Sequence, residues 1–527
     1  MSLQTEIERR RTFAIISHPD AGKTTITEKI LWHGGVIQVA GEVRGKAGTK
    51  AATSDWMKME QERGVSITSS VMQFDYQGLR VNLLDTPGHK DFGEDTYRTL
   101  IAVDCAAMLM DAAKGVEEQT RKLFDVCKLR KLPIFTFANK MDREGKSPLE
   151  LIDDVEKTLG MICYPVTWPI GIGDQFKGLY HRLENKLYLY VRGRVEPEIV
   201  EVESWSDPKI RERVGERLFD TLQEEMELLQ GVVGDFDEES FLKGELSPMT
   251  FGSAKHNWGV DIFLRLFTDR APPPQPRQLL NGESVSPYES EFSGFVFKIQ
   301  ANMDKRHRDR VAFIRVCSGQ FDRGMKVQHQ RLGKELRLNY ANQFVAQERE
   351  TVDQAVAGDI LGLNDMGNFQ IGDTITSTKK WQFGGIPRFS PEHFGRVVIK
   401  EALKKRQLEK GVRQLVDEGT IQYFYDPLVG HQDPILGVVG VLQFDVLMYR
   451  LKDEYGLEAR LEMLPFKLAR WPFEPDGAPL KTPLKGSRTK TYFDINDKAV
   501  ILLEKEWDMR WIQEDNPDIV FKSTISD

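Results

Sequence analysis

Short runs of strand-forming apolar residues alternate with amphipathic segments through the first third of the chain. The runs lie at residues 13–16, 81–84, 106–110 and 134–138, and Met72, Phe74 and Tyr76 alternate with polar neighbours. This alternation predicts an α/β domain with a mostly parallel sheet and helices on both faces. Ser147 and Glu150 have the spacing of a capping box, which predicts the start of a helix running towards Leu159.

Proline and glycine divide the chain into domains. The segment 271–276 contains four prolines and can continue neither a helix nor a central strand. We therefore expect the α/β domain to cover residues 1–275, with an inserted subdomain at about 155–245. Strands separated by glycine- and aspartate-containing turns predict a small β-barrel over residues 276–386.

A second boundary is expected near residues 384–391, where glycine and proline recur. Between residues 396 and 463 the pattern is strand, helix, strand, strand, helix, strand, which is the order of a ferredoxin-like domain. We expect this α+β domain to cover residues 387–527 and to end in an irregular C-terminal tail. The predicted fold class is multidomain α/β.

Composition narrows the class of protein. The chain has 527 residues, of which 40% are hydrophobic and 29% charged, and a net charge of -8. This charge excludes a uniformly basic nucleic-acid binder but allows local basic patches. There is no apolar run long enough for a membrane span and no signal-like start, so we expect a cytoplasmic protein without membrane or DNA partners. The four separated cysteines are expected to be core residues.

A candidate phosphate-binding loop follows the first predicted strand and opens a helix. Its residues are Ser17, His18, Pro19, Asp20, Ala21, Gly22, Lys23 and Thr24. Backbone N–H groups at a helix start can cradle phosphates, the Lys23 ammonium can neutralise the β- and γ-phosphates, and the Thr24 hydroxyl can ligate Mg²⁺. The bland alternative is a turn at an ordinary helix start, and Ser17 stands where the motif has its first glycine.

A second motif, Asp85, Thr86, Pro87, Gly88 and His89, ends the strand at residues 81–84. That strand should lie beside the first, so Asp85 can reach Mg²⁺ through water and the Gly88 N–H can bond the γ-phosphate. An ordinary turn is the alternative.

Two further motifs bear on the choice of base. The first is Asn139, Lys140, Met141 and Asp142, and the second is Ser253, Ala254 and Lys255. The Asp142 carboxylate can accept from guanine N1–H and the exocyclic amine, which adenine does not offer in that arrangement. The Lys140 stem can lie against the base, Asn139 can tie the loops together, and the Ala254 N–H can meet guanine O6. A helix cap at Asn139 is the alternative.

The order of the motifs, each after a strand, predicts a GTP-hydrolysing enzyme that binds GTP or GDP with Mg²⁺. A metabolic kinase is disfavoured because Asn-Lys-x-Asp reads guanine. Between the first two motifs, residues 41–66 have the composition of a segment that could order around the γ-phosphate, and Ser66 is the candidate hydroxyl for Mg²⁺. A solvated loop is the alternative there.

These residues resemble the translational GTPases, whose hallmarks are Arg-Gly-x-Ser/Thr-Ile, here from Arg63, and Asp-Thr-Pro-Gly-His. The resemblance implies that His89 positions the attacking water and that Pro19 and Val65 flank it. Most members carry Thr at the Ser66 position, and Thr68 is a rival Mg²⁺ ligand.

Within these GTPases the chain is most similar to the class II release factors. The similar segments are 17–25, 55–57 leading into 62–64, 166–171, 294–303 and 440–446. The resemblance implies that the GTP form binds the ribosome after peptide release and dissociates the class I release factor, with hydrolysis stimulated by the ribosome. We also consider a translocase-like or ribosome-protecting GTPase, which the chain length disfavours, and a switch protein whose hydrolysis is incidental.

The predicted helix at residues 401–418 is basic on one side. Its cations are Lys404, Lys405, Arg406, Lys410 and Arg413. They could contact RNA or a ribosomal protein, but the pattern alone favours a solvated amphipathic face.

Overall fold

The computed structural model describes residues 2–37, 69–194, 196–301, 310–345, 348–384, 386, 388–480, 483–486 and 490–525. Val65, Ser66 and Thr68 lie outside the described residues, as do the similar segments 55–57 and 62–64 and the end of 294–303. Every described helix is too short or too polar to cross a lipid bilayer.

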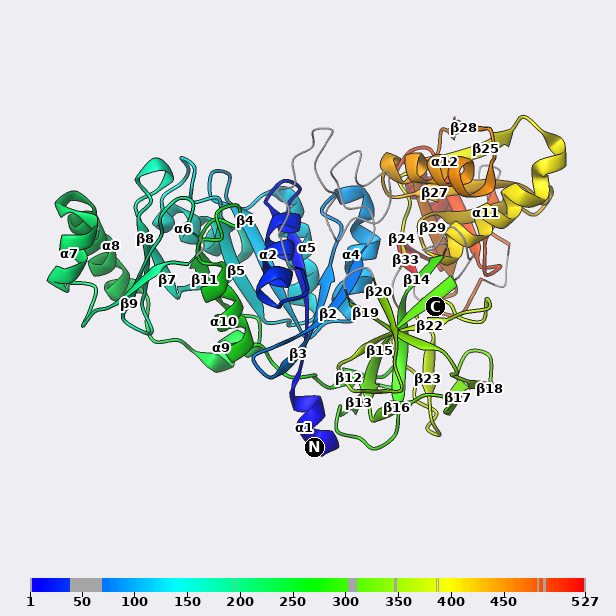
Figure 1. Ribbon diagram of the computed structural model, residues 1–527. Helices are drawn as coiled ribbons and strands as arrows, with labels where there is room; N and C mark the ends of the chain where they lie inside the picture. The colour runs from blue at the N-terminus through cyan, green and yellow to red at the C-terminus, as the bar shows by residue number, and fades with distance from the viewer. Residues whose placement is uncertain are drawn as a thin grey trace.

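Seven of the described strands form the sheet of the first domain, in the order β2-β3-β1-β4-β5-β11-β6 (Figure 1). Their bounds are β1 (Arg10–Ser17), β2 (Ser70–Tyr76), β3 (Leu79–Asp85), β4 (Cys105–Asp111), β5 (Ile134–Asn139), β6 (Ile162–Pro165) and β11 (Leu246–Phe251). Only β2 is antiparallel to its neighbour in this described sheet. The predicted mostly parallel α/β domain is confirmed.

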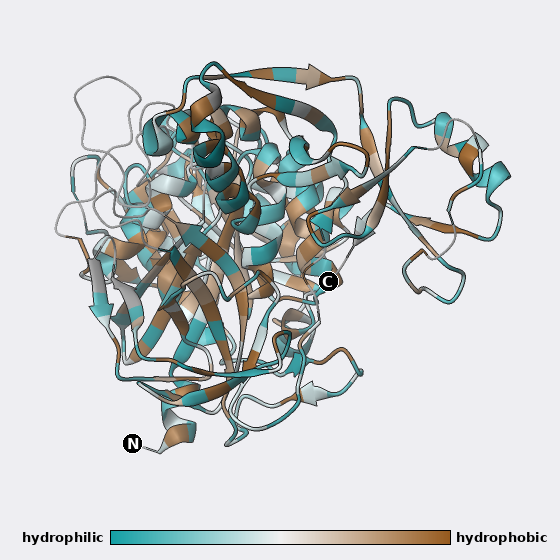
Figure 2. Cartoon of the chain, turned by 90° about the vertical axis from the view of Figure 1, so that its right-hand side faces the viewer, coloured by the Kyte–Doolittle hydropathy of each residue, from teal (hydrophilic) through white to brown (hydrophobic). Residues whose placement is uncertain are grey.

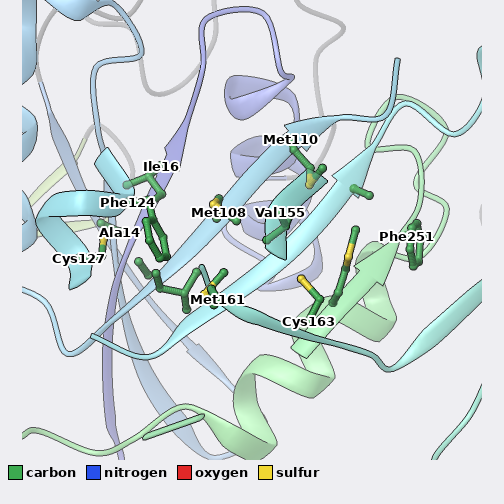
Figure 3. Packing of buried hydrophobic residues seen from close by; sticks show 14 of the residues in the cluster. Ala14, Ile16, Met108, Met110, Phe124, Cys127, Val155, Met161, Cys163 and Phe251 are labelled. Atoms are coloured by element: carbon green, nitrogen blue, oxygen red, sulfur yellow. The ribbon is translucent and has the colours of Figure 1, made fainter. Parts of the chain in front are cut away.

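Helices cover both faces of this sheet because successive strand side chains point to opposite sides. Phe13 and Ile15 pack with α2 (Lys23–His33) and α10 (Val260–Arg270). Ala14 and Ile16 face the other way, towards α4 (Gly93–Ile101), α5 (Glu118–Leu129) and α6 (Pro148–Leu159). Figure 3 shows part of this second cluster, in which buried Cys127 and Cys163 act as small core residues.

The predicted capping box is present at the start of α6. Glu150 N–H donates to Ser147 Oγ at 3.3 Å, and Ser147 N–H donates to the Glu150 carboxylate at 2.7 Å. The helix ends at Leu159, before Gly160 in the left-handed conformation.

A separate unit is inserted between β6 and β11 and lies at the left end of the molecule in Figure 1. It contains β7 (Thr167–Ile170), β8 (Gly178–His181), β9 (Lys186–Leu189), β10 (Glu198–Glu201), α7 (Pro208–Val214), α8 (Glu216–Val232) and α9 (Glu238–Leu242). Because β6 pairs with β11 in the parallel sheet, residues 155–165 belong to the main domain rather than to the insertion expected at about 155–245.

The second domain is antiparallel, and its described strands include a sheet ordered β18-β17-β23-β14-β15-β22-β19-β20 around a core with Val296 and Ile314. The strands are β14 (Ser293–Ala301), β15 (Arg310–Ser318), β17 (Lys326–His329), β18 (Lys334–Arg337), β19 (Ala341–Val345), β20 (Glu348–Thr351), β22 (Ile360–Asn364) and β23 (Thr374–Thr376). Two short pairs lie beside it: β12 (Arg277–Gln278) with β13 (Ser284–Val285), and β16 (Gln320–Asp322) with β21 (Gln354–Val356).

The third domain has the predicted element order: β25 (His393–Ile399), α11 (Lys405–Asp417), β26 (Gln422–Asp426), β27 (Gly430–Val438), α12 (Val441–Tyr455) and β28 (Ala459–Leu464). The strands pair as β28-β25-β27-β26, the ferredoxin-like order. Leu415 of α11 and Leu447 of α12 pack against strand residues such as Leu436. In Figure 2 the surface helices carry both polar and apolar stretches.

The expectation of an irregular tail is wrong for the described residues. The chain that follows β28 adds further strands to the same sheet, which continues from β26 in the order β30-β31-β29-β32. The elements are β29 (Leu468–Phe473), β30 (Thr491–Asp494), β31 (Ala499–Leu503), α13 (Asp508–Asp515), β32 (Val520–Lys522) and β33 (Thr524–Ile525), which pairs with β24 (Arg388–Phe389). Trp471 is 1% exposed and donates to Asp494 at 3.2 Å. Burial against partners distant in sequence stabilises these short strands.

Candidate nucleotide-binding site

The four motifs follow the carboxyl ends of β1, β3, β5 and β11. These strands run parallel, so their ends meet at one edge of the sheet, where ligands of open α/β sheets bind. The register aligns Ile15 with Asp85 and Asp111 with Asn139. The fold therefore gathers the loops that the sequence singles out.

The first loop turns at Gly22, the N-cap of α2, with φ 98°. A side chain is excluded there, because a Cβ would lie 2.3 Å from Asn139 Nδ2 as well as require a left-handed backbone. The N–H groups of the first turn of α2 lack helical acceptors and provide a site for an anion. Thr24 is half-buried in this turn.

Lys23 and Asp85 form a buried ion pair, with 2.5 Å between Nζ and Oδ1. Their side chains are 7% and 1% exposed. The other Asp85 oxygen, Oδ2, and Ser17 Oγ are buried and have no hydrogen-bond partner among the described residues. Unsatisfied buried polar atoms are costly, so this corner is suited to a hydrated cation.

Asn139 joins the first loop to the last, as the sequence suggests. Its amide nitrogen donates to Ala21 O at 2.7 Å, and its oxygen accepts from Ala254 N–H at 2.8 Å. Lys140 extends the link by donating to Asp20 O at 2.5 Å and pairing with Asp111 at 2.7 Å. The phosphate and base loops are therefore held as one rigid unit.

Asp142 is held by two groups from the segment after β11. The Ser253 hydroxyl donates to Oδ1 at 2.6 Å, and His256 Nε2 lies 3.5 Å from Oδ2. Met141 is fully buried in the core, so only its backbone can take part in the site. Lys255 is exposed.

His89 lies a third exposed beyond Gly88, and its Nδ1 faces Asp91. The Asp91 N–H donates to Nδ1 at 3.3 Å, and Asp91 Oδ1 is also 3.3 Å away. The first contact needs Nδ1 without a proton and the second needs it protonated, so Asp91 can serve either state of the ring. Its other oxygen accepts from Leu442 N–H of the third domain at 2.8 Å.

The helix that follows His89 is docked on the third domain. Glu94 accepts from Phe389 N–H at 2.7 Å and pairs with Arg98 at 3.0 Å. Burial raises the pKa of Glu94, although Arg98 opposes this. Arg98 also donates to Gly419 O at 3.3 Å. The segment beside the candidate catalytic residue therefore contacts the third domain directly.

Three contacts of the site were not expected from the sequence. Asp111 holds Lys140, His256 faces Asp142, and Glu117 lies 3.3 Å from His18 Nε2. Only Asp111 carried a signal, because it ends β4 at the same edge of the sheet.

Comparison with protein families covers most of the chain. The model described as Elongation factor Tu GTP binding domain matches residues 8–273, and Elongation factor G domain 2 matches residues 291–378. The model described as Class II release factor RF3, C-terminal domain, matches residues 383–513.

Curated relatives match over nearly the full length. Peptide chain release factor 3 of Symbiobacterium thermophilum is 52% identical over 531 residues, covering 99% of both chains. The same factor from Synechococcus elongatus is 49% identical over 524 residues, covering 99% of this chain and 94% of its own. A solved structure from Thermus thermophilus has a TM-score of 0.69 over 92% of this chain and 72% of its own, and at 23% identity it supports the fold alone. The chain belongs to the peptide chain release factor 3 family, the GTPases of translation termination.

Proposed function

We propose that this protein works in the cytoplasm, where its GTP form binds the ribosome after peptide release and drives the class I release factor off. Hydrolysis then releases the protein itself. The observation that carries the GTP cycle is the Asn139 side chain, which bonds both Ala21 and Ala254 and so fixes the phosphate loop relative to the base loop. Family membership supports the step on the ribosome.

In this proposal the site residues divide between the phosphates, the base and the metal. The start of α2 and Lys23 hold the phosphates, while Asp142 and the Lys140 stem select guanine. The Ala254 N–H, which the sequence placed against guanine O6, donates to Asn139 in this structure, so its part here is to hold the loop. Thr24, together with Asp85 acting through water, would hold Mg²⁺, which fits the unsatisfied Asp85 Oδ2. Ser66, or its rival Thr68, would complete the metal ligands from outside the described residues. When bound, Mg²⁺ neutralises charge that develops on the phosphate oxygens.

His89 would position the attacking water. Asp91 occupies its Nδ1, which leaves Nε2 as the ring nitrogen to meet the water. The partly exposed ring and its link through Asp91 to Leu442 give the ribosome two routes to orient it, directly or by moving the third domain. We therefore expect slow hydrolysis by the free protein and strong stimulation by ribosomes.

Replacing His89 by Ala is expected to lower ribosome-stimulated hydrolysis by about 10²–10⁴-fold, because a positioned proton-transfer group is lost. Affinity for GDP should stay close to that of the unaltered protein. Single-turnover hydrolysis with and without ribosomes measures the effect. The control is His33→Ala, which removes a histidine bonded to Asn257 at the other end of α2. An undiminished rate in His89→Ala would rule out this role.

The ribosomal step is tested with a labelled class I release factor on ribosomes that have already released their peptide. We expect GTP with this protein to speed dissociation of the factor, whereas GDP should not. Ribosome-stimulated hydrolysis without faster dissociation would leave a translational GTPase whose task on the ribosome is a different one.

A further inference from the structure

A cleft lies between the second and third domains. It has a volume of about 790 Å³, and its walls include Arg310 from β15, the exposed face of α11 and His431 from β27. The described part of the nucleotide site does not contribute to it, so the GTP cycle leaves this cleft without an assigned role.

The charges in the cleft are not balanced. Its lining has five cations and three carboxylates, and Arg310 already pairs with Asp365 at 2.7 Å and Asp417 at 2.5 Å. The remaining cations are Lys405, Arg406, Lys410 and Arg413. All four are exposed, and none forms an ion pair or side-chain hydrogen bond with another residue of the described ranges.

The structure makes an ordinary solvated helix face a poorer explanation of these four cations than the sequence alone does. Elsewhere in this protein exposed helical lysines pair four residues away, as Lys157 does with Asp153 at 2.8 Å. Glu409 is four residues from both Lys405 and Arg413, yet among the described residues it pairs with neither. Four cations without an ion pair among the described residues, and more cations than carboxylates in one cleft of a chain with net charge -8, indicate an anionic partner.

One exposed ring, that of His431, lies at the same cleft in contact with the buried ring of Tyr423. His431 is exposed and stacks on Tyr423, with ring centroids 5.9 Å apart and 29° between planes. Its Nδ1 lies 3.0 Å from the Tyr423 hydroxyl, which fixes the ring. Cations that follow a backbone, with rings on which bases can stack, are the combination used to bind single-stranded nucleic acid.

We infer that this cleft binds the phosphate backbone of ribosomal RNA, with Lys405, Arg406, Lys410 and Arg413 on the phosphates. The inference rests on the proposed function, since it needs a ribosome-binding protein. An acidic protein segment is the competing partner, but it makes less use of the stacked His431.

The test is a triple charge reversal, Lys405→Glu, Lys410→Glu and Arg413→Glu. Ribosome affinity should fall about tenfold or more, and the slope of log affinity against log salt should become shallower by about 2–3, since each lost phosphate contact contributes roughly 0.7–0.9. The matched control reverses Lys122, Lys157 and Lys243, which are exposed and paired on other helices. Far-ultraviolet circular dichroism and the urea midpoint of both variants check that they are folded, because GDP affinity reports on the first domain alone.

Ultraviolet cross-linking of the unaltered protein to ribosomes gives a second readout. Peptides from residues 401–434 should carry nucleotides. Unchanged ribosome affinity in the triple variant would overturn the inference. Weaker binding with an unchanged salt slope, and with no nucleotide on those peptides, would also overturn it and would indicate a protein partner. Failure of the unaltered protein to bind ribosomes would instead remove both the proposed function and this inference.

Discussion

Replacing Asp142 by Asn should exchange guanine for xanthine specificity. The carboxylate is placed to accept two hydrogen bonds from guanine, and each bond to a charged group contributes roughly 1.5–3 kcal/mol. We therefore expect GDP affinity to fall by about two orders of magnitude or more, at 1.4 kcal/mol per tenfold. An Asn amide can donate to the xanthine carbonyl that replaces the guanine amine, so XDP should bind more tightly than GDP. Nucleotide titrations of both ligands measure this.

The matched control is Ser253→Ala, which removes the hydroxyl that donates to Asp142 at 2.6 Å but keeps the carboxylate. We expect it to weaken GDP binding by less than about tenfold, the value of one ordinary hydrogen bond, with no gain for XDP. Equal weakening of both nucleotides in Asp142→Asn would mean that this carboxylate supports the loop rather than reading the base.

The motifs of the site could be predicted because each is short and follows a strand. Asn139 is one case: its spacing within Asn-Lys-x-Asp suggested a link between loops, and the structure has that link. The partners of Asp142 and Lys140 could not be predicted in the same way. His256 and Asp111 reach them from other strand ends, and such pairings depend on sheet order rather than on local spacing.

The fold follows the same division. The apolar run of β1 and the Ser147 capping box could be recognised from the sequence, because each depends on residues that are close together in the chain. The strands after β28 depend on distant partners, as when Arg470 pairs with Ile501, and their short apolar runs are separated by polar turns. In so short a segment, the intrinsic strand propensity of the residues stabilises the strand less than burial against a neighbouring strand does.

The docking of α4 on the third domain had no sequence signal at all. In the turn just before α4, Asp91 packs closely on Gly440 of the third domain, where a Cβ would lie 2.0 Å from Asp91 Cγ. Asp91 also faces His89, so the contact between domains and the candidate catalytic ring share one carboxylate. A movement of the third domain on the ribosome would therefore be transmitted through Asp91 to His89.

Asp104 is expected to contribute more to stability than any exposed ion pair of this protein. It is fully buried between the first two domains and accepts from Arg277 at 3.0 Å and Arg315 at 2.5 Å. Replacing it by Ala leaves two buried guanidinium groups without their carboxylate, which costs about 3–5 kcal/mol. Burial already lowers the pKa of Arg277, so unpaired charge at this place is poorly tolerated. Urea unfolding followed by fluorescence should show the loss as an earlier midpoint.

Asp153→Ala is the matched control, because it breaks the exposed pair with Lys157 and should leave the midpoint almost unchanged. The double variant Asp104→Ala with Arg315→Met should be less destabilised than the sum of the single changes, since removing one cation relieves the charge left by the missing carboxylate. Strict additivity would show that Asp104 and Arg315 act independently. A midpoint in Asp104→Ala equal to that of Asp153→Ala would show that water replaces the carboxylate and that this contact does not hold the two domains together.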